Sequence, residues 1–217
     1  MTKNNEVERY VNHQKNWGVV LFFALMLISR SSFADWYIVP TGSMLPTIVE
    51  GDRIFVNKMA YRLEIPFTNI ELMQTGEPNR GDIVVFNSEK AGVRMVKRLI
   101  GLPGDKVAMH NNQLSINGKP LVYSELDETN KGTEKIANVA HKLQFVGAAQ
   151  ADTFNEVIVP HEHYLVLGDN RNNSADSRYY GFIPAKELQG RAIEVIISLD
   201  ESNYYLPRKK RFFTPLI

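Results

Sequence analysis

Short apolar runs alternate with turns along most of the chain after Ile38. The runs are rich in valine and isoleucine, and glycine, proline and asparagine separate them. This pattern predicts β-strands. Asn117 and Gly118, in the middle of residues 113–121, predict a hairpin with a type I′ turn. We expect further strands at 53–56, 82–86, 93–100, 156–159, 163–167 and 192–199.

A polar and weakly periodic stretch at 124–153 interrupts the strand pattern and separates two better-specified halves. Within it, residues 133–142 are compatible with a helix. We therefore expect a mainly β fold, in which a smaller inserted β lobe at 108–155 divides a main β domain formed by 38–107 and 156–205.

The N-terminal region carries an uncharged apolar run at 17–28. A helix of this length reaches only about 18 Å, whereas the hydrocarbon core of a bilayer is about 30 Å thick. A helix that continued to Tyr37 would be long enough, with Arg30 extending toward the headgroups and Trp36 at the interface. We therefore expect one transmembrane anchor at 17–37, preceded by a cytoplasmic tail at 1–16.

A second interpretation of this region is a cleavable export signal, because the triplet at 32–34 has the small-x-small form of a cleavage site. Arg30 interrupts the approach to this triplet, which favours a retained helix. Lys3, Arg9 and Lys15 precede the apolar run, and basic residues stay on the cytoplasmic side. They favour a cytoplasmic N-terminus and an exported remainder.

Composition narrows the possible functions. With 217 residues, 44% of them hydrophobic, the chain can form one domain with a substantial core. Its net charge of +1 gives no reason to expect binding to nucleic acid. Because cysteine is absent, disulfides, thiolate zinc sites and a cysteine nucleophile are excluded. A basic and aromatic C-terminal tail at 206–217 is either a solvated charge run or a patch that contacts anionic lipid.

Two residues are candidates for catalysis. Ser43 lies in the sequence T-G-S-M-L-P-T, and a serine hydroxyl needs an adjacent base to become a nucleophile. None of the histidines stands in a recognisable triad motif. Lys97 lies in a strand-like run, where alternation places it on one face with Met95 and Leu99. Desolvation lowers the pKa of a buried lysine, and the neutral amine could then accept the proton of Ser43.

The stretch at 168–178, G-D-N-R-N-N-S-A-D-S-R, has almost no side chain to bury. We expect a polar loop in which Ser174 orients the Lys97 amine and Asp176 forms an ion pair with Arg178. Oxygen-rich loops also bind calcium, so a metal site remains an alternative. Its ligands would be Asp169, Asn170 and Asp176.

The chain resembles the type I signal peptidases, which are membrane-anchored Ser/Lys endopeptidases that remove export signals. Four blocks match in order, from the anchor to about residue 199: 41–47, 81–86, 96–105 and 168–178. The resemblance implies that Ser43 is the nucleophile and that Lys97 is the general base. It implies neither a cofactor nor a metal ion.

The resemblance also implies roles for neighbouring residues. The Ser43 backbone N–H and the Thr41 hydroxyl would form an oxyanion hole, and Ser174 would hold the lysine. Asn172 departs from the family, which often has aspartate there. Small apolar pockets would be formed by Val39, Pro40, Met44, Ile48, Met95 and Ala175, and the polar loop would be structured by Asp169, Asn170, Arg171, Asp176 and Arg178.

We therefore expect an endopeptidase that cleaves exported preproteins after small-x-small sites, on the outer side of the bacterial cytoplasmic membrane. Its partners would be preproteins and membrane lipid. A self-cleaving repressor-type Ser/Lys protease is one alternative, but it would need a DNA-binding N-terminal domain, and the apolar run at 17–28 argues against one. The other alternative is a membrane-anchored β module that binds exported peptides by strand addition, without catalysis.

Overall fold

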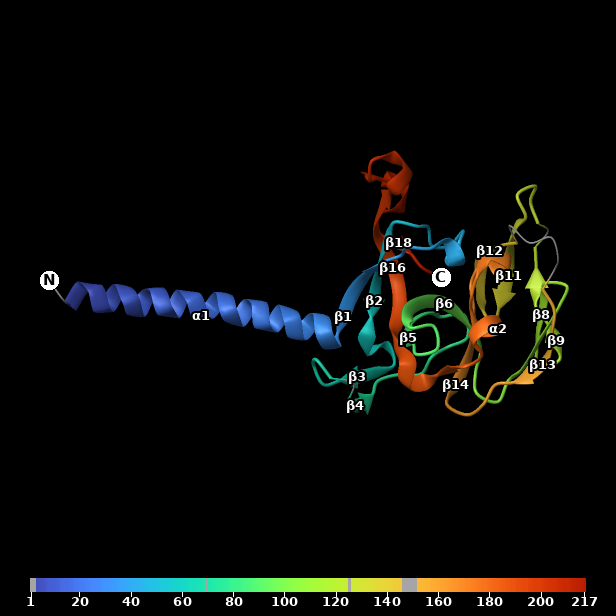
Figure 1. Ribbon diagram of the computed structural model, residues 1–217, viewed down its shortest axis with the longest axis horizontal. Helices are drawn as coiled ribbons and strands as arrows, with labels where there is room; N and C mark the ends of the chain where they lie inside the picture. Colours follow the sequence, from blue (N-terminus) through green and yellow to red (C-terminus); the bar gives the residue numbers. More distant parts are fainter. Residues whose placement is uncertain (1–2, 69, 125, 146–151) are drawn as a thin grey trace.

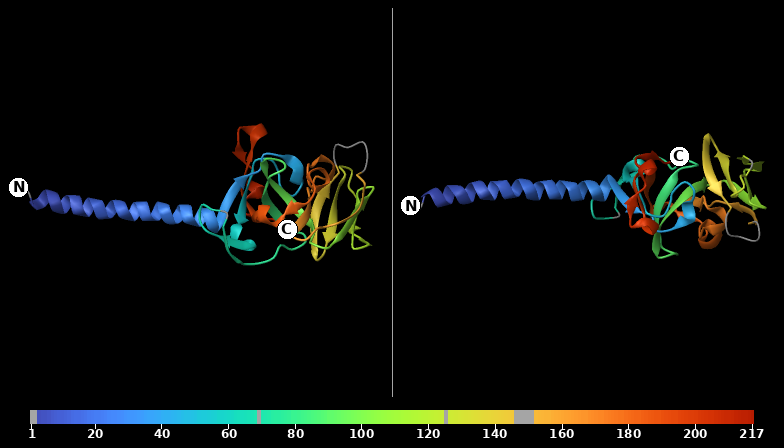
Figure 2. Two further views of the ribbon diagram at one scale, coloured as in Figure 1. Left: turned by 60° about the horizontal axis from the view of Figure 1, so that its bottom comes forward. Right: turned by 90° about the horizontal axis from the view of Figure 1, so that it is seen from above.

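A long N-terminal helix, α1 (Lys3–Ser32), projects from a β-rich body (Figure 1). The computed structural model describes residues 3–68, 70–124, 126–145 and 152–217, with side chains from Trp17 onward. Within these residues, the structure contains no helix that is both long enough and apolar enough to cross a membrane. Figure 2 shows from two further directions that α1 and the lobe formed by β7–β13 lie at opposite ends of the body.

The expectation that the helix continues to Tyr37 is wrong. After Ser32 the chain turns and forms a strand, β1 (Ala34–Ile38), which pairs antiparallel with β2 (Asp52–Asn57). Trp36 stands opposite Phe55 in this pair. The backbone groups of this segment therefore make hydrogen bonds within a sheet, and they are not available to continue a helix.

The main sheet has nine strands in the order β1-β2-β16-β5-β6-β14-β15, and β17 and β18 both pair with β16. The neighbouring strands that we describe in this sheet run antiparallel. Strands β5 and β6 place residues from the blocks at 81–86 and 96–105 side by side. The further strands are β5 (Ile83–Ser88), β6 (Val93–Gly101), β14 (His163–Leu167), β15 (Ile183–Pro184), β16 (Leu188–Asp200), β17 (Leu206–Pro207) and β18 (Thr214–Pro215).

Three smaller sheets complete the body. One has the order β13-β7-β8-β9, a second has the order β10-β11-β12, and the third is a hairpin of β3 and β4. Their strands are β3 (Arg62–Glu64), β4 (Glu71–Gln74), β7 (Lys106–His110), β8 (Gln113–Ile116), β9 (Lys119–Pro120), β10 (Val122–Tyr123), β11 (Lys131–Ile136), β12 (Val139–Gln144) and β13 (Phe154–Ile158).

The helix considered for 133–142 is not present. These residues belong to β11 and β12, which form an antiparallel hairpin in which Ile136 pairs with Val139. Glu134 and His141 pair across the hairpin, and both side chains are buried. Alternate residues of this hairpin are buried on one face, which is the pattern of a β-strand. This pattern outweighs the weak helical periodicity of the segment.

The other strand predictions are confirmed. Each of the six expected segments lies in or overlaps a strand, namely β2, β5, β6, β13, β14 and β16. The hairpin at 113–121 is also present, and Asn117 and Gly118 both have positive φ, at 51° and 74°. Positive φ at both central positions is what a type I′ turn requires.

Two hydrophobic clusters include residues next to Ser43 and Lys97. One includes Met44 and Ile48, which follow Ser43. The other includes Val84 and Leu99, from β5 and β6. A third cluster fills the lobe and is built mainly on β7 and β8. The first two clusters therefore anchor the residues that neighbour Ser43 and Lys97.

Candidate active site

Ser43 is held on a single 3₁₀ turn, Gly42–Met44, which lies between β1 and β2. The turn is closed by a hydrogen bond from Leu45 N to the Gly42 carbonyl (3.1 Å), and Ile48 N donates to the Met44 carbonyl (2.9 Å). Met44 and Ile48 are buried in the core. Since its neighbours are anchored in this way, the half-buried Ser43 side chain has a fixed direction.

Lys97 lies on β6, and its Nζ atom is 2.5 Å from Ser43 Oγ. Its side chain is buried, with an exposed fraction of 3% for the residue. Lys97 pairs with Val84 across the sheet, and strand alternation places it on the face that carries Met95 and Leu99. The expected burial of Lys97 is therefore confirmed.

Burial lowers the pKa of Lys97 to about 8, because the apolar surroundings disfavour the ammonium. The negative charges of Asp176 and Asp169 oppose this effect, and the positive charge of Arg178 adds to it. A lysine with this pKa is partly neutral near physiological pH. It can therefore accept a proton from the hydroxyl group that it contacts.

Asn170 holds the backbone on which Ser43 stands. Its backbone N–H donates to the Ser43 carbonyl (3.1 Å), and its side-chain amide donates to the Gly42 carbonyl (3.0 Å). A Cβ atom on Gly168 would overlap the Ser43 carbonyl oxygen and the Ser174 hydroxyl, so the loop approaches the serine closely at a position that only glycine permits. The loop at 168–178 thus positions Ser43 directly.

The two carboxylates considered as calcium ligands are instead paired with guanidinium groups. Asp169 accepts two hydrogen bonds from Arg98, both 2.8 Å long, and the side chains of this pair are fully buried. Asp176 accepts from Arg178 at 2.6 Å and 2.8 Å, which confirms the expected ion pair. Bidentate pairing occupies the oxygen atoms that a cation would need. The geometry therefore favours ion pairing over a calcium site.

The comparisons with known proteins agree with this geometry. Residues 14–197 match the family model described as "Signal peptidase, peptidase S26". This chain belongs to that family.

Three relatives from Bacillus and Pseudomonas species support the assignment. Signal peptidase I of Bacillus amyloliquefaciens is 37% identical, over 82% of this chain and 81% of its own length. Signal peptidase I T of Bacillus subtilis is 34% identical, over 92% and 95%. Signal peptidase I of Pseudomonas aeruginosa is 32% identical, over 91% and 76%. A crystal structure of a signal peptidase I from Enterococcus faecalis, 32% identical, covers 53% of this chain and 96% of that chain, with a TM-score of 0.37.

Sequence reasoning missed two residues that support the loop of this signal peptidase family member. Arg98 lies in the block at 96–105, but nothing in the pattern indicated that it is buried with Asp169. Thr47 closes the block at 41–47, and its hydroxyl donates to Asp169 (2.5 Å). Asp169 therefore links the Ser43 segment to the strand that carries Lys97. The arginine that follows the buried lysine could have indicated the pair of Arg98 and Asp169, since a buried charge needs a partner of opposite charge.

A second buried ion pair joins the lobe to the same loop. Arg171 donates to both oxygens of Glu134, at 2.9 Å and 2.5 Å, and His141 Nε2 lies 3.3 Å from Glu134 and 3.8 Å from Asp169. Burial raises the pKa of Glu134, but Arg171 outweighs this effect and holds it well below its usual range. The lobe therefore contacts the loop through charged groups. Sequence reasoning missed this because Glu134 and His141 lie in the polar insertion.

The remaining expected residues lie around the site in different environments. The Ser174 hydroxyl is buried and, among the described residues, has no hydrogen-bond partner. Its role in orienting Lys97 therefore stays a prediction. Thr41 immediately precedes the turn of Ser43, and its side chain is exposed.

The residues expected to form substrate pockets divide into two groups. Val39, Met44 and Ile48 are buried in the core beneath Ser43. Three others reach or approach the surface, where a substrate could contact them: Pro40, Met95 and Ala175.

Proposed function

We propose that this chain removes signal peptides from exported preproteins, with Ser43 as the nucleophile and Lys97 as the general base. The observation that carries the proposal is the contact of 2.5 Å between Lys97 Nζ and Ser43 Oγ inside a buried environment. Membership of the signal peptidase family supports the same activity. The direct serine–lysine contact also removes the need for a histidine in the mechanism.

The proposed reaction has two steps. Neutral Lys97 takes the proton of Ser43, and Oγ attacks the carbonyl carbon of the scissile bond. The resulting ammonium gives this proton to the departing amine, which leaves an acyl group on Ser43. Lys97 then activates a water molecule in the same way, and hydrolysis of the ester releases the signal peptide and restores the serine.

An oxyanion develops in both steps, and we assign its stabilisation to the Ser43 backbone N–H and the Thr41 hydroxyl. Thr41 immediately precedes the turn that carries Ser43, which supports this assignment. A donor of this kind typically contributes about 2.7 to 4 kcal/mol to the transition state.

We propose that cleavage follows small-x-small sequences. A shallow apolar surface rejects large side chains by overlap and gains little from each methyl group of a small one. Pro40, Met95 and Ala175 are the candidates for this surface, with the buried residues beneath Ser43 as its base. Ser174 would orient the Lys97 amine in the substrate complex.

We also propose that α1 anchors the enzyme in the bacterial cytoplasmic membrane, with the N-terminus on the cytoplasmic side and the β-rich body on the outer side. The helix α1 projects from the body (Figure 1). Its apolar side chains from Trp17 onward are largely exposed. Exposed apolar surface of this extent requires a partner, and lipid matches its chemistry. An anchored enzyme meets a membrane-bound preprotein at raised effective concentration.

The test is cleavage of a purified preprotein in detergent by the wild type, Ser43→Ala and Lys97→Ala. Each variant is expected to lose activity by about 10⁴-fold or more, because either change removes one half of the nucleophile–base pair. Lys186→Ala is a matched control, since this lysine is exposed and pairs with Glu89 at the surface. Undiminished processing by either site variant would contradict the proposal and favour a peptide-binding module.

A further inference from the structure

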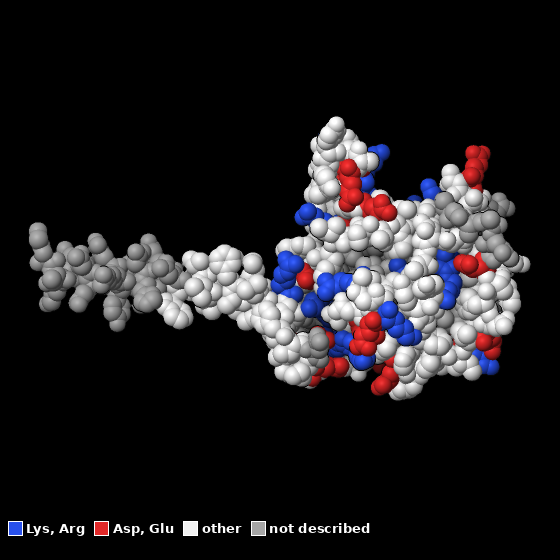
Figure 3. Space-filling view, viewed as in Figure 1, with Lys and Arg blue, Asp and Glu red and all other residues white. Residues whose placement is uncertain are grey.

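The chain reverses direction after β16 and returns along the same strand. Leu199 stands opposite Pro207 of β17, and Val195 stands opposite Thr214 of β18. Residues 200–213 form an arm that projects from the sheet (Figure 1). In Figure 3, basic and acidic side chains both lie on this arm. The match to the family model ends at residue 197, so family membership assigns no role to the arm.

The basic run at 208–211 is divided between solvent and the body. Its two lysines are exposed, whereas Arg208 and Arg211 are half-buried. Arg208 donates to the Glu50 carbonyl (2.8 Å), which lies in the Ser43 segment, residues 43–52. Arg211 contacts the same segment. The two arginines therefore join the arm to the part of the chain that carries the proposed nucleophile.

Arg211 binds the Ser43 segment at two places. Its guanidinium donates to both oxygens of the Asp52 carboxylate, at 2.5 Å and 3.1 Å, and to the Thr47 carbonyl at 3.0 Å. Asp52 is fully buried, and it also accepts a hydrogen bond from Val49 N (2.8 Å). A guanidinium carries its donors in a fixed plane, so one side chain can hold a carboxylate and a carbonyl in a defined geometry.

Thr47 is held from two directions as a result. Its carbonyl accepts from Arg211, and its hydroxyl donates to Asp169 (2.5 Å) in the polar loop. The next residue, Ile48, donates from its backbone N to the Met44 carbonyl (2.9 Å), which belongs to the 3₁₀ turn of the proposed nucleophile. Because these groups are joined by consecutive hydrogen bonds, a shift of Thr47 would displace this turn.

The last part of the returning segment contacts the same region from behind. Leu216 N donates to the Ile193 carbonyl (2.8 Å), and the Leu216 side chain packs against the hydrophobic cluster beneath Ser43. The Ile217 carbonyl oxygen accepts from Arg98 (2.9 Å), the arginine of the fully buried ion pair. The segment at 211–217 therefore adjoins both supports of the site, the core beneath the serine and the buried arginine.

We propose that Arg211 is a positioning residue for Ser43. The inference rests on the proposed function, because it assigns Arg211 a part in that reaction. Arg211 acts through Thr47 and Asp52, and not through contact with the reacting atoms. Its loss lets the Ser43 segment move, so that the hydroxyl group no longer meets the scissile carbonyl in a fixed geometry. The rate of the chemical step should therefore fall more than the affinity for substrate.

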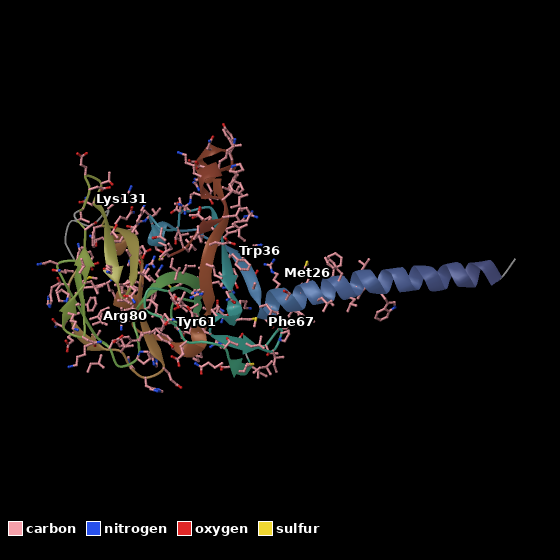
Figure 4. All side chains as sticks on the ribbon, turned by 180° about the vertical axis from the view of Figure 1, so that it is seen from behind. Met26, Trp36, Tyr61, Phe67, Arg80 and Lys131 are labelled. Carbon is pink, nitrogen blue, oxygen red and sulfur yellow. The ribbon has the colours of Figure 1, made fainter. Side chains whose placement is uncertain are left out.

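Three substitutions in the full chain separate positioning from stability: Arg211→Met, Arg80→Met and Lys210→Met. Arg80 is a matched control, because it also donates to one carboxylate, Asp105 (2.8 Å), and to one backbone carbonyl, Ile100 (2.6 Å). The side-chain exposures are similar, 18% for Arg80 and 21% for Arg211. Figure 4 shows Arg80 away from the projecting arm. Lys210→Met removes one exposed positive charge from the same basic run.

Cleavage of a purified preprotein in detergent gives kcat and KM for each protein. We expect Arg211→Met to lower kcat by about tenfold or more with a smaller change in KM, because a displacement of about 1 Å can reduce a rate by about 10²-fold. Arg80→Met and Lys210→Met should keep the kcat of the wild type. A wild-type kcat in Arg211→Met would overturn the inference. Equal losses in Arg211→Met and Arg80→Met would indicate an effect of stability alone, and would also overturn it.

Amide hydrogen exchange measures the same effect without catalysis. In Arg211→Met, the backbone amides at 45–48 should exchange about tenfold faster than in the wild type, whereas those at 83–88 in β5 should keep their rate. Arg80→Met should leave both regions unchanged. Unchanged exchange at 45–48 in Arg211→Met would overturn the inference. A wild type that cleaves no preprotein would instead contradict the proposed function, and the exchange rates would still show whether Arg211 holds the segment.

Arg211→Lys replaces Arg211→Met in both measurements if the methionine variant does not fold. A lysine keeps the positive charge, but it lacks the planar set of donors that binds Asp52 and Thr47 together. We therefore expect the same changes at smaller size, with kcat lowered by about threefold. Wild-type kcat and wild-type exchange in the lysine variant would then overturn the inference.

Discussion

Lys97 and Arg98 follow one another on β6, yet they occupy opposite electrostatic environments. Lys97 pairs across the sheet with Val84, and its amine contacts a neutral hydroxyl group. Arg98 points to the other face, where it meets the carboxylate of Asp169. Lys97 can therefore lose its positive charge, whereas the charge of Arg98 is compensated by Asp169 and is retained. The strand thus carries both the proposed general base, Lys97, and the arginine that supports the loop at 168–178.

The rate of cleavage should rise with pH through the pKa of Lys97, which is about 8. Only the neutral amine accepts a proton, and at pH 7 about one tenth of the enzyme carries it. Val84→Thr places a hydroxyl beside the amine, stabilises the ammonium and should move the acidic limb of kcat/KM to higher pH. An unchanged limb in this variant would show that desolvation does not set the pKa.

The lowered pKa of Lys97 should also make folding stability depend on pH, and this can be measured without substrate. Burial lowers the pKa of Lys97 from 10.5 in the unfolded chain to about 8. Between these pH values only the unfolded chain binds the proton, so stability rises with pH across this window. Lys97→Met has no such proton to bind. As the pH rises through this window, the free energy of unfolding of the wild type should therefore increase relative to that of Lys97→Met by up to about 3 kcal/mol. Denaturant titrations of both proteins at pH 7.5 and 10.5 measure this change. The same difference in free energy of unfolding at both pH values would contradict the lowered pKa.

Loss of the buried partner of Arg98 should be costly. Asp169→Asn leaves the guanidinium of Arg98 buried without a counter-charge, and such changes typically destabilise by about 3 to 5 kcal/mol. Glu89→Gln provides the comparison, because its ion pair with Lys186 is exposed, with side-chain exposures of 71% and 70%. That change should cost less than about 1 kcal/mol. Similar losses in the two variants, measured by chemical denaturation, would argue against a structural role for the buried pair.

Gly168→Ala should damage catalysis through the position of Ser43. The added methyl group would overlap the Ser43 carbonyl oxygen and the Ser174 hydroxyl, so the loop or the serine must move. A displacement of about 1 Å can reduce a rate by about 10²-fold. We expect this loss in kcat with a smaller change in KM. Gly18→Ala, which meets nothing within 4 Å, is the control, and equal activity of the two variants would disprove the close approach.

The sequence predicted the local features well, because local chemistry determines them. The six strand segments and the Asn117-Gly118 turn follow from alternation and from the need for positive φ. The proximity of Ser43 and Lys97, 54 positions apart, was suggested by the chemistry of the two side chains and by the resemblance to a known family. Neither source required knowledge of the fold.

Features that depend on partners distant in the sequence were missed. The end of α1 at Ser32 depends on pairing between β1 and β2, which the apolar run alone does not reveal. Glu134 and His141 look like surface residues until the hairpin of β11 and β12 brings them against Arg171. A polar side chain can be buried once its partner is in place. In this chain the partners of the buried polar side chains lie far away in the sequence, as Arg171 does from Glu134.

The short connection between α1 and β1 links the direction of the helix to that of the active site. Only Phe33 separates the two elements, its carbonyl accepts from Lys58 N, and an ion pair between Arg30 and Asp35 spans the junction. A rigid joint of this kind transmits any tilt of the helix to the β-rich body. With α1 anchored in a bilayer as we propose, lipid composition would turn Ser43 toward or away from the membrane surface, since membrane helices tilt to match bilayer thickness. The thickness of the bilayer would then determine which peptide bonds of a preprotein come within reach of Ser43.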